Sequence, residues 1–221
     1  MDVDESQLKD FKLKPMKCEF NVLSKSDGSA ILSQGETVVI VSVNGPLDIK
    51  MQSQSIEKAT LEVLCCSKGG KPCVADRYKE NIIKQTCDAA LLSNQYPRTG
   101  ITITVQELED CGGLLPCSLN CACLALINSG LAMRCVFAAV TCVVDEQGDI
   151  VLGPSKEQLD TARAVLNFVF DSRDKSLMTG FTEGSFSEDT YKEAMERCRV
   201  ASDLVFAFYR DIVKQYSKII A

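Results

Sequence analysis

Apolar and polar side chains alternate in short segments along the first half of the chain, as they do in strands with one buried face. Four such segments are residues 18–23, 29–32, 37–43 and 59–66. Turn residues at 26–28 and 34–36 separate the first three segments, which predicts an antiparallel meander. The third segment, TVVIVSV, is so rich in β-branched residues that we expect it to be buried on both faces and to end at Asn44-Gly45-Pro46.

The stretch 101–132 has the clearest organisation in the chain. Residues 101–106 (ITITVQ) alternate as a strand does, and the Gly112-Gly113 pair that follows predicts a tight turn. Residues 114–131 carry no charge, which predicts a central helix buried nearly all round. Polar breaks interrupt this run, whereas a bilayer span needs ~20 cleaner apolar residues, so we expect no membrane span. The helix start is either an anion-binding turn or a plain core element.

The remaining pattern predicts helices and strands in alternation. We expect helices at 75–92 and 156–162, the second capped by Ser155, and strands at 134–144 and 150–152. Residues 164–170 and 176–182 form a hairpin pair in this interpretation. Ser185 and Glu188 have the spacing of a capping box, which predicts that a long final helix starts there. No low-complexity linker is visible. We therefore expect a flexible segment at 1–15 and a single α+β domain at 16–221.

The net charge of −6 means that nucleic-acid binding would need a local basic patch. The densest basic cluster lies around the predicted helix 75–92 and is the candidate nucleic-acid-binding set. It comprises Lys68, Lys71, Arg77, Lys79, Lys84 and Arg98. The pattern fits an RNA-contacting patch and an ordinary solvated helix face equally well.

The chain has no histidine and twelve cysteines. Without histidine, Ser-His-Asp catalysis, Cys-His catalysis and His-ligated metals are excluded. The acidic, polar start MDVDESQLKD does not resemble a secretory signal, so we expect reduced thiols in the cytosol or nucleus. The C-x3-C-x-C spacing at 117–123 lacks the paired C-x2-C units of zinc sites. We therefore expect core-filling cysteines and no metal site.

Several segments together resemble a known family. They are GSAILSQGETVVIVSVNGP (28–46), the helix at 76–93, PRTGITITVQELEDCGGLLPCSLNCACLALINSGLAM (97–133) and DIVLGPSKEQ (149–158). This order and spacing is similar to the RNase PH family, in particular to eukaryotic exosome ring subunits of the ribosomal RNA-processing protein 46 type. The resemblance covers roughly 18–217 and implies an α+β, RNase PH-like fold. Such a fold has two pseudo-repeated halves of mixed β-sheet packed with helices.

The resemblance also implies where a phosphate site would lie. Active family members degrade RNA from its 3′ end with phosphate, which arginines hold and a carboxylate assists. The first arginine would follow Gly112-Gly113, where this chain has Leu114 and Leu115, and the second corresponds to Gln85. The aspartate before the strand 164–170 is replaced by Arg163-Ala164. Each lost arginine removes a charge-assisted pair worth ~1.5–3 kcal/mol, so phosphorolysis should be very weak or absent, although Gly112-Gly113 could remain a weak anion nest.

By resemblance we expect a non-catalytic subunit of the RNA exosome ring that binds RNA and supports 3′–5′ RNA processing, including rRNA processing and RNA surveillance. Its partners would be other RNase PH-like subunits and cap subunits, with no cofactor. Its location would be the nucleus, including the nucleolus, and the cytoplasm.

The alternative is a stand-alone homodimer that binds DNA or RNA, or a metal-dependent nuclease that degrades DNA, including in cell death. Glu157 and Asp160 would then hold Mg²⁺, with Asp110 nearby, although a solvated helix end explains both residues more simply. A fully active phosphate-dependent exoribonuclease is a third hypothesis, against which Leu114, Leu115 and Gln85 argue.

Overall fold

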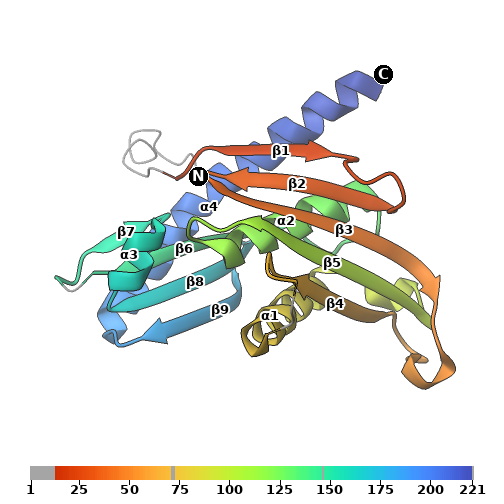
Figure 1. Cartoon of the computed structure of the whole chain (residues 1–221), viewed down its shortest axis with the longest axis horizontal. Coiled ribbons are helices and arrows are strands. Elements are labelled where there is room, and N and C mark those ends of the chain that lie inside the picture. The colour runs from red at the N-terminus through yellow and green to blue at the C-terminus, as the bar shows by residue number, and fades with distance from the viewer. Residues whose placement is uncertain (1–12, 71–72, 146, 221) are drawn as a thin grey trace.

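The computed structural model describes residues 13–70, 73–145 and 147–220, which form two sheets with helices between and beside them (Figure 1). The first sheet has five strands in the order β1-β2-β3-β5-β4. These are β1 (Met16–Phe20), β2 (Gly28–Gln34), β3 (Thr37–Asp48), β4 (Thr60–Cys66) and β5 (Thr99–Glu109). The predicted antiparallel meander is confirmed for β1, β2 and β3. Strand β4 is parallel to β5, so the chain must cross over, and helix α1 (Val74–Ala90) makes this connection.

The second sheet has four strands in the order β7-β6-β8-β9. They are β6 (Phe137–Val144), β7 (Ile150–Leu152), β8 (Ala164–Asp171) and β9 (Leu177–Gly184). The predicted hairpin is confirmed as the antiparallel pair β8–β9. The short helix α3 (Lys156–Thr161) is capped by Ser155, as predicted, because the Ser155 side chain accepts a hydrogen bond from the N–H of Gln158. The two predicted halves of the fold are therefore the two sheets.

Helix α2 (Leu114–Ser129) is the central element, as the charge-free run predicts. Every residue from Pro116 to Leu126 is buried, because α2 contacts β2 and β3 of one sheet and β6 of the other. The buried Asn120 amide donates to the carbonyl of Ala139 at 3.0 Å. Its oxygen accepts from the N–H of Ala139 at 2.7 Å and from the hydroxyl of Tyr209 at 2.9 Å. This network ties α2 to β6 and to the last helix, α4 (Glu188–Ile220).

Helix α4 runs beside both halves, and its C-terminal part extends past the edge strand β1 (Figure 1). The hydroxyl of Tyr216 accepts a hydrogen bond from the N–H of Phe20 at 3.0 Å, and the two rings are in contact. Two short 3-10 turns, Met51–Ser53 and Ser93–Gln95, complete the regular structure. Among the described residues, no helix is both long and apolar enough to cross a membrane.

Several boundary predictions were wrong. Strand β1 ends at Phe20 and not at residue 23. Strand β3 continues through Asn44-Gly45-Pro46 because β5 keeps pairing with it as far as Asp48, and only alternate β3 residues are fully buried because α2 covers one face. The long helix is not capped by Ser185, because the Ser187 hydroxyl accepts the N–H of Thr190 at 3.2 Å. Strand β6 begins at Phe137, three residues later than predicted, and the N–H of Arg134 instead binds the carbonyl of Ala90.

Candidate functional site

The Gly112-Gly113 turn connects β5 to α2, and both residues have positive φ, at 98° and 74°. The Thr37 hydroxyl holds the turn by donating to the carbonyl of Gly112 at 2.8 Å and accepting from the N–H of Cys111 at 3.1 Å. A Cβ on Gly112 would lie 2.7 Å from the backbone nitrogen of Lys156. The turn is therefore pressed against the start of α3, and only glycine fits there.

The Gly112 N–H is already used inside the protein. It donates to the carboxylate of Asp110 at 3.0 Å, and Gly112 is buried. The Lys14 ammonium lies nearby but donates to the carbonyl of Pro154 at 2.7 Å and more weakly to that of Cys111 at 3.5 Å. The expected anion nest therefore lacks the Gly112 donor, and a carboxylate stands where an anion would approach.

Leu114 and Leu115 occupy the first turn of α2 and pack as partly buried side chains against the core. Hydrocarbon offers a phosphate no hydrogen bond and no charge. Leu114 also lines a narrow cleft together with Asp76, Lys79 and Ile83 of α1. The first phosphate-site position is thus part of the packing between α1 and α2.

Gln85 and Arg163 occupy the other two positions that the resemblance singles out, and both side chains are exposed. The backbone of Arg163 is fixed, since its N–H binds the carbonyl of Val144 at 3.0 Å and its carbonyl accepts the N–H of Ser185 at 3.4 Å. The neutral Gln85 amide cannot replace an arginine that holds phosphate, and the Arg163 cation cannot replace a carboxylate that assists a leaving group.

Lys68, Arg77 and Lys84 form what we call the α1 basic stripe. All three side chains are exposed, and Arg77 and Lys84 are seven residues apart, so they share one face of α1. Lys68 lies in the loop that leads into this helix. Asn81, four residues after Arg77 and three before Lys84, is exposed on the same face and is uncharged. Lys71 lies outside the described residues.

The structure does not bring Lys79 and Arg98 into this stripe. The Lys79 ammonium lies 3.7 Å from the carboxylate of Asp76 and faces the cleft beside Leu114. Arg98 precedes β5, and its N–H binds the carbonyl of Ser55, whereas the loop with Lys68 follows Cys66, which pairs with Gln106. Arg98 and Lys68 are therefore at opposite ends of β5, about 20 Å apart at the usual rise per strand residue.

Glu157 and Asp160 are both exposed on α3, three residues apart. Across residues 13–70, 73–145 and 147–220, no group of three or more His, Cys, Asp or Glu side chains could hold a metal ion. The geometry therefore offers the Mg²⁺ alternative two solvated carboxylates and no assembled ligand set.

The twelve cysteines are all free thiols, and most are buried. Cys121 donates to the carbonyl of Ala30 at 3.3 Å, and Cys117 donates to that of Leu32 at 3.8 Å, so α2 is bonded to β2 through sulfur. Burial raises the pKa of the Cys117 thiol to about 12. The prediction of core-filling cysteines is confirmed for these residues, whereas Cys66 and Cys73 are exposed.

Sequence reasoning missed Thr37 and Lys14, which position the Gly-Gly turn. Thr37 is fully buried, although in sequence it is only the first residue of an apolar strand. Lys14 falls in the segment that we predicted to be flexible, yet its ammonium is bonded to two backbone carbonyls. No local pattern marks either residue, because their partners are 74 to 140 positions away.

Comparison with known proteins agrees with this architecture. Residues 12–132 match the model of the 3′ exoribonuclease family, domain 1, and residues 135–198 match domain 2. An Arabidopsis thaliana protein, "Exosome complex exonuclease RRP46 homolog", is 31% identical over 223 residues, which cover 93% of each chain. The crystal structure of rice (Oryza sativa) Rrp46 superposes with a TM-score of 0.88 at 30% identity, covering 92% of this chain and 96% of that one.

A more distant match shows the fold alone. A chain of the Archaeoglobus fulgidus exosome, solved "with RNA bound to the active site", superposes with a TM-score of 0.77 at 17% identity and covers 93% of this chain and 95% of its own length. The two sheets, the Gly-Gly turn and the matches over both domains define one class of protein: this chain belongs to the RNase PH (3′ exoribonuclease) family. Within that family it resembles the RRP46 homologues.

Proposed function

We propose that this chain is a non-catalytic, RNase PH-like subunit of an RNA exosome ring, which binds RNA and supports 3′–5′ processing and degradation. One observation carries the proposal: the place where phosphate would be gripped is built from packed leucine side chains and a turn whose Gly112 N–H already binds Asp110. Phosphorolysis needs phosphate held as a nucleophile by cations, and neither Leu115 nor Gln85 provides one.

The RNA contact that we propose is the α1 basic stripe. Its exposed cations suit the phosphate backbone, and such contacts are independent of sequence and sensitive to salt. Lys79 contributes less in this proposal because Asp76 lies within 3.7 Å of its ammonium. Arg98, at the far end of β5, would contact RNA only as a separate site.

The partners that we propose are other RNase PH-like subunits and cap subunits, and the RRP46 names of the relatives support these partners. The location that we propose for such an assembly is the nucleus, including the nucleolus, and the cytoplasm. A homodimer that degrades DNA is not favoured, since the described residues offer no metal-ligand cluster.

The test of this proposal is reconstitution. The chain is expressed alone and together with RNase PH-like subunits of the same organism, and each sample is sized by light scattering and titrated with labelled single-stranded RNA. We expect a mixed ring that binds RNA more tightly than the isolated chain does. A chain that stays a homodimer in the presence of those subunits would contradict the ring assignment.

A further inference from the structure

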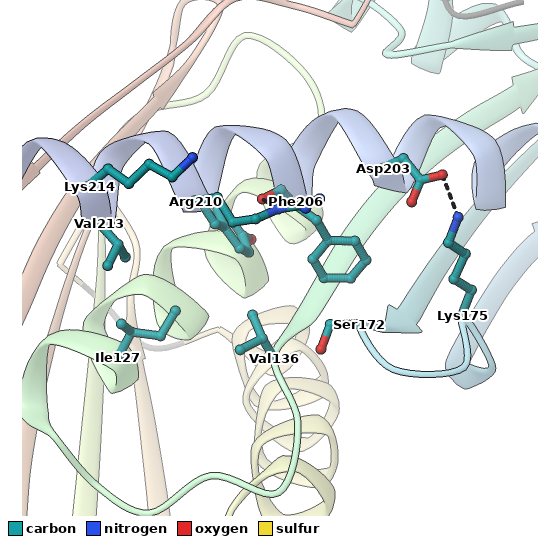
Figure 2. Close-up of a pocket in the computed structure, with 10 residues that line it drawn as sticks. Ile127, Val136, Ser172, Lys175, Asp203, Phe206, Arg210, Val213 and Lys214 are labelled. Atoms are coloured by element: carbon teal, nitrogen blue, oxygen red, sulfur yellow. Dashed lines mark hydrogen bonds and ion pairs between the residues drawn. The ribbon is translucent and has the colours of Figure 1, made fainter. Parts of the chain in front are cut away.

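A groove runs along α4 and has a volume of about 870 Å³. Phe206, Tyr209 and Val213 of α4 form one wall, and Ile127 and Val136 form the other. Figure 2 shows Phe206 and Val213 directed across the groove toward Val136 and Ile127. Phe206 is 7% exposed and Val213 is 40% exposed, so the groove has a mostly buried floor and an open edge.

The α4 residues that line the groove lie on one face of the helix. Tyr209, Arg210 and Val213 lie three, four and seven residues after Phe206, which places all four on one face of the helix. From Asp203 to Lys214 the groove extends over eleven residue steps of α4, or about 16 Å at the helical rise. This length suits roughly three turns of a second helix or a short extended segment better than it suits a compact metabolite.

The rim of the groove is positively charged. Lys175 pairs with Asp203 at 2.7 Å and closes one end, as Figure 2 shows. Toward the other end lie Arg210 and Lys214, which form no ion pair with any residue that the structure describes. The Arg210 guanidinium donates through Nε only to the carbonyl of Phe206, at 3.3 Å. Two exposed, unpaired cations beside an apolar groove favour an occupant that has carboxylates beside its apolar side chains.

We propose that this groove binds a segment of a partner polypeptide that carries large apolar side chains at helical spacing, flanked by Asp or Glu. RNA is a poorer fit, because Phe206 and Tyr209 are too buried for a base to stack on them. The groove shares no residue with the α1 basic stripe. The proposal therefore does not rest on RNA binding or on the ring assignment, and it can fail independently of either.

The experiment selects random sixteen-residue peptides by display on the purified full chain. Enriched peptides are synthesised with a fluorophore, and their Kd is measured by anisotropy on wild type and on two groove variants, Val213→Asp and Arg210→Glu/Lys214→Glu. Val22→Asp is a matched control, because Val22 and Val213 are both 40% exposed. Lys17→Glu/Lys25→Glu reverses two exposed charges elsewhere on the surface. Circular dichroism verifies that each variant is folded.

We expect enriched peptides to combine acidic residues with Leu, Ile, Phe or Met. We expect their Kd to rise about tenfold or more in both groove variants and to stay unchanged in both controls. Failure to enrich peptides, or enrichment of peptides that the groove variants bind equally well, overturns the proposal. So does labelled poly(U) RNA that loses affinity in the groove variants, and so does a self-association, measured by light scattering, that Val213→Asp abolishes.

Discussion

Removing two cations of the α1 basic stripe should change the salt dependence of RNA binding by an amount that can be worked out beforehand. On single-stranded nucleic acid the logarithm of the affinity falls with the logarithm of salt by about 0.7 per neutralised phosphate. If Lys68, Arg77 and Lys84 each neutralise one phosphate, the slope is about −2. A rise from ~50 to ~200 mM salt then weakens binding roughly 15- to 20-fold.

The double variant Arg77→Ala/Lys84→Ala leaves Lys68 as the remaining cation of the stripe. Its slope should be about −0.7, so the same rise in salt should weaken binding only about two- to threefold. Lys79→Ala should change the slope less than Arg77→Ala alone or Lys84→Ala alone does, because Asp76 already compensates the Lys79 ammonium. Asn81→Lys should strengthen binding and steepen the slope, because it adds a cation to the same exposed face.

The assay is fluorescence anisotropy of a labelled poly(U) oligonucleotide at several salt concentrations, with Lys17→Ala/Lys25→Ala as the control. Both control lysines are exposed and lie away from α1, so their removal tests the effect of net charge alone. An unchanged slope in the stripe variant would refute the reasoning. An equal loss of slope in the control would show that bulk charge, and not the stripe, attracts the RNA.

Three further predictions concern the scaffold. Asn120→Ala leaves the buried backbone of Ala139 unpaired and should lower the free energy of unfolding in urea by ~2–4 kcal/mol. Gly112 has a φ of 98°, and an added Cβ would lie 2.7 Å from a backbone nitrogen. Gly112→Ala should therefore lower the free energy of unfolding by ~1–3 kcal/mol in the same assay. The raised pKa of Cys117, about 12 against 9.0, means that its contribution to stability is complete below pH 9 and is lost as the pH rises toward 12, by ~1.4 kcal/mol per pH unit. Other buried thiols also have raised pKa values, so urea titrations at about pH 9, 10 and 11 should show the stability of wild type falling more steeply with pH than that of a Cys117→Ala variant, by this single-group amount.

Periodicity predicts an element well when the element's own residues determine its burial. Helix α2 carries no charge over its whole length and could only be central, and the β8–β9 hairpin has clear turn residues between its strands. Strand β3 shows the limit: it continues past Gly45-Pro46 because β5 pairs with it there, and that pairing partner is more than fifty residues away.

The candidate site shows the same limit. The glycine pair itself predicted the Gly112-Gly113 turn, and the family resemblance implied a phosphate site beside it. The bonds from Thr37 and Lys14, however, join segments that are distant in sequence. The basic cluster is dense along the chain, yet the parallel pairing of β4 with β5 places Arg98 at the opposite end from Lys68. Closeness in sequence therefore predicted more cations on one surface than the α1 basic stripe contains.

The central claim is that the site at the Gly112-Gly113 turn does not bind phosphate for catalysis, and the release of nucleoside diphosphate tests this claim most directly. The purified chain, alone and in its reconstituted ring, is incubated with 3′-labelled RNA and inorganic phosphate, and the products are resolved by chromatography. The packed Leu114 and Leu115 and the occupied Gly112 N–H predict no release that this chain supports. Nucleoside diphosphate formed by the chain alone, at a rate that rises with phosphate concentration, would contradict the account.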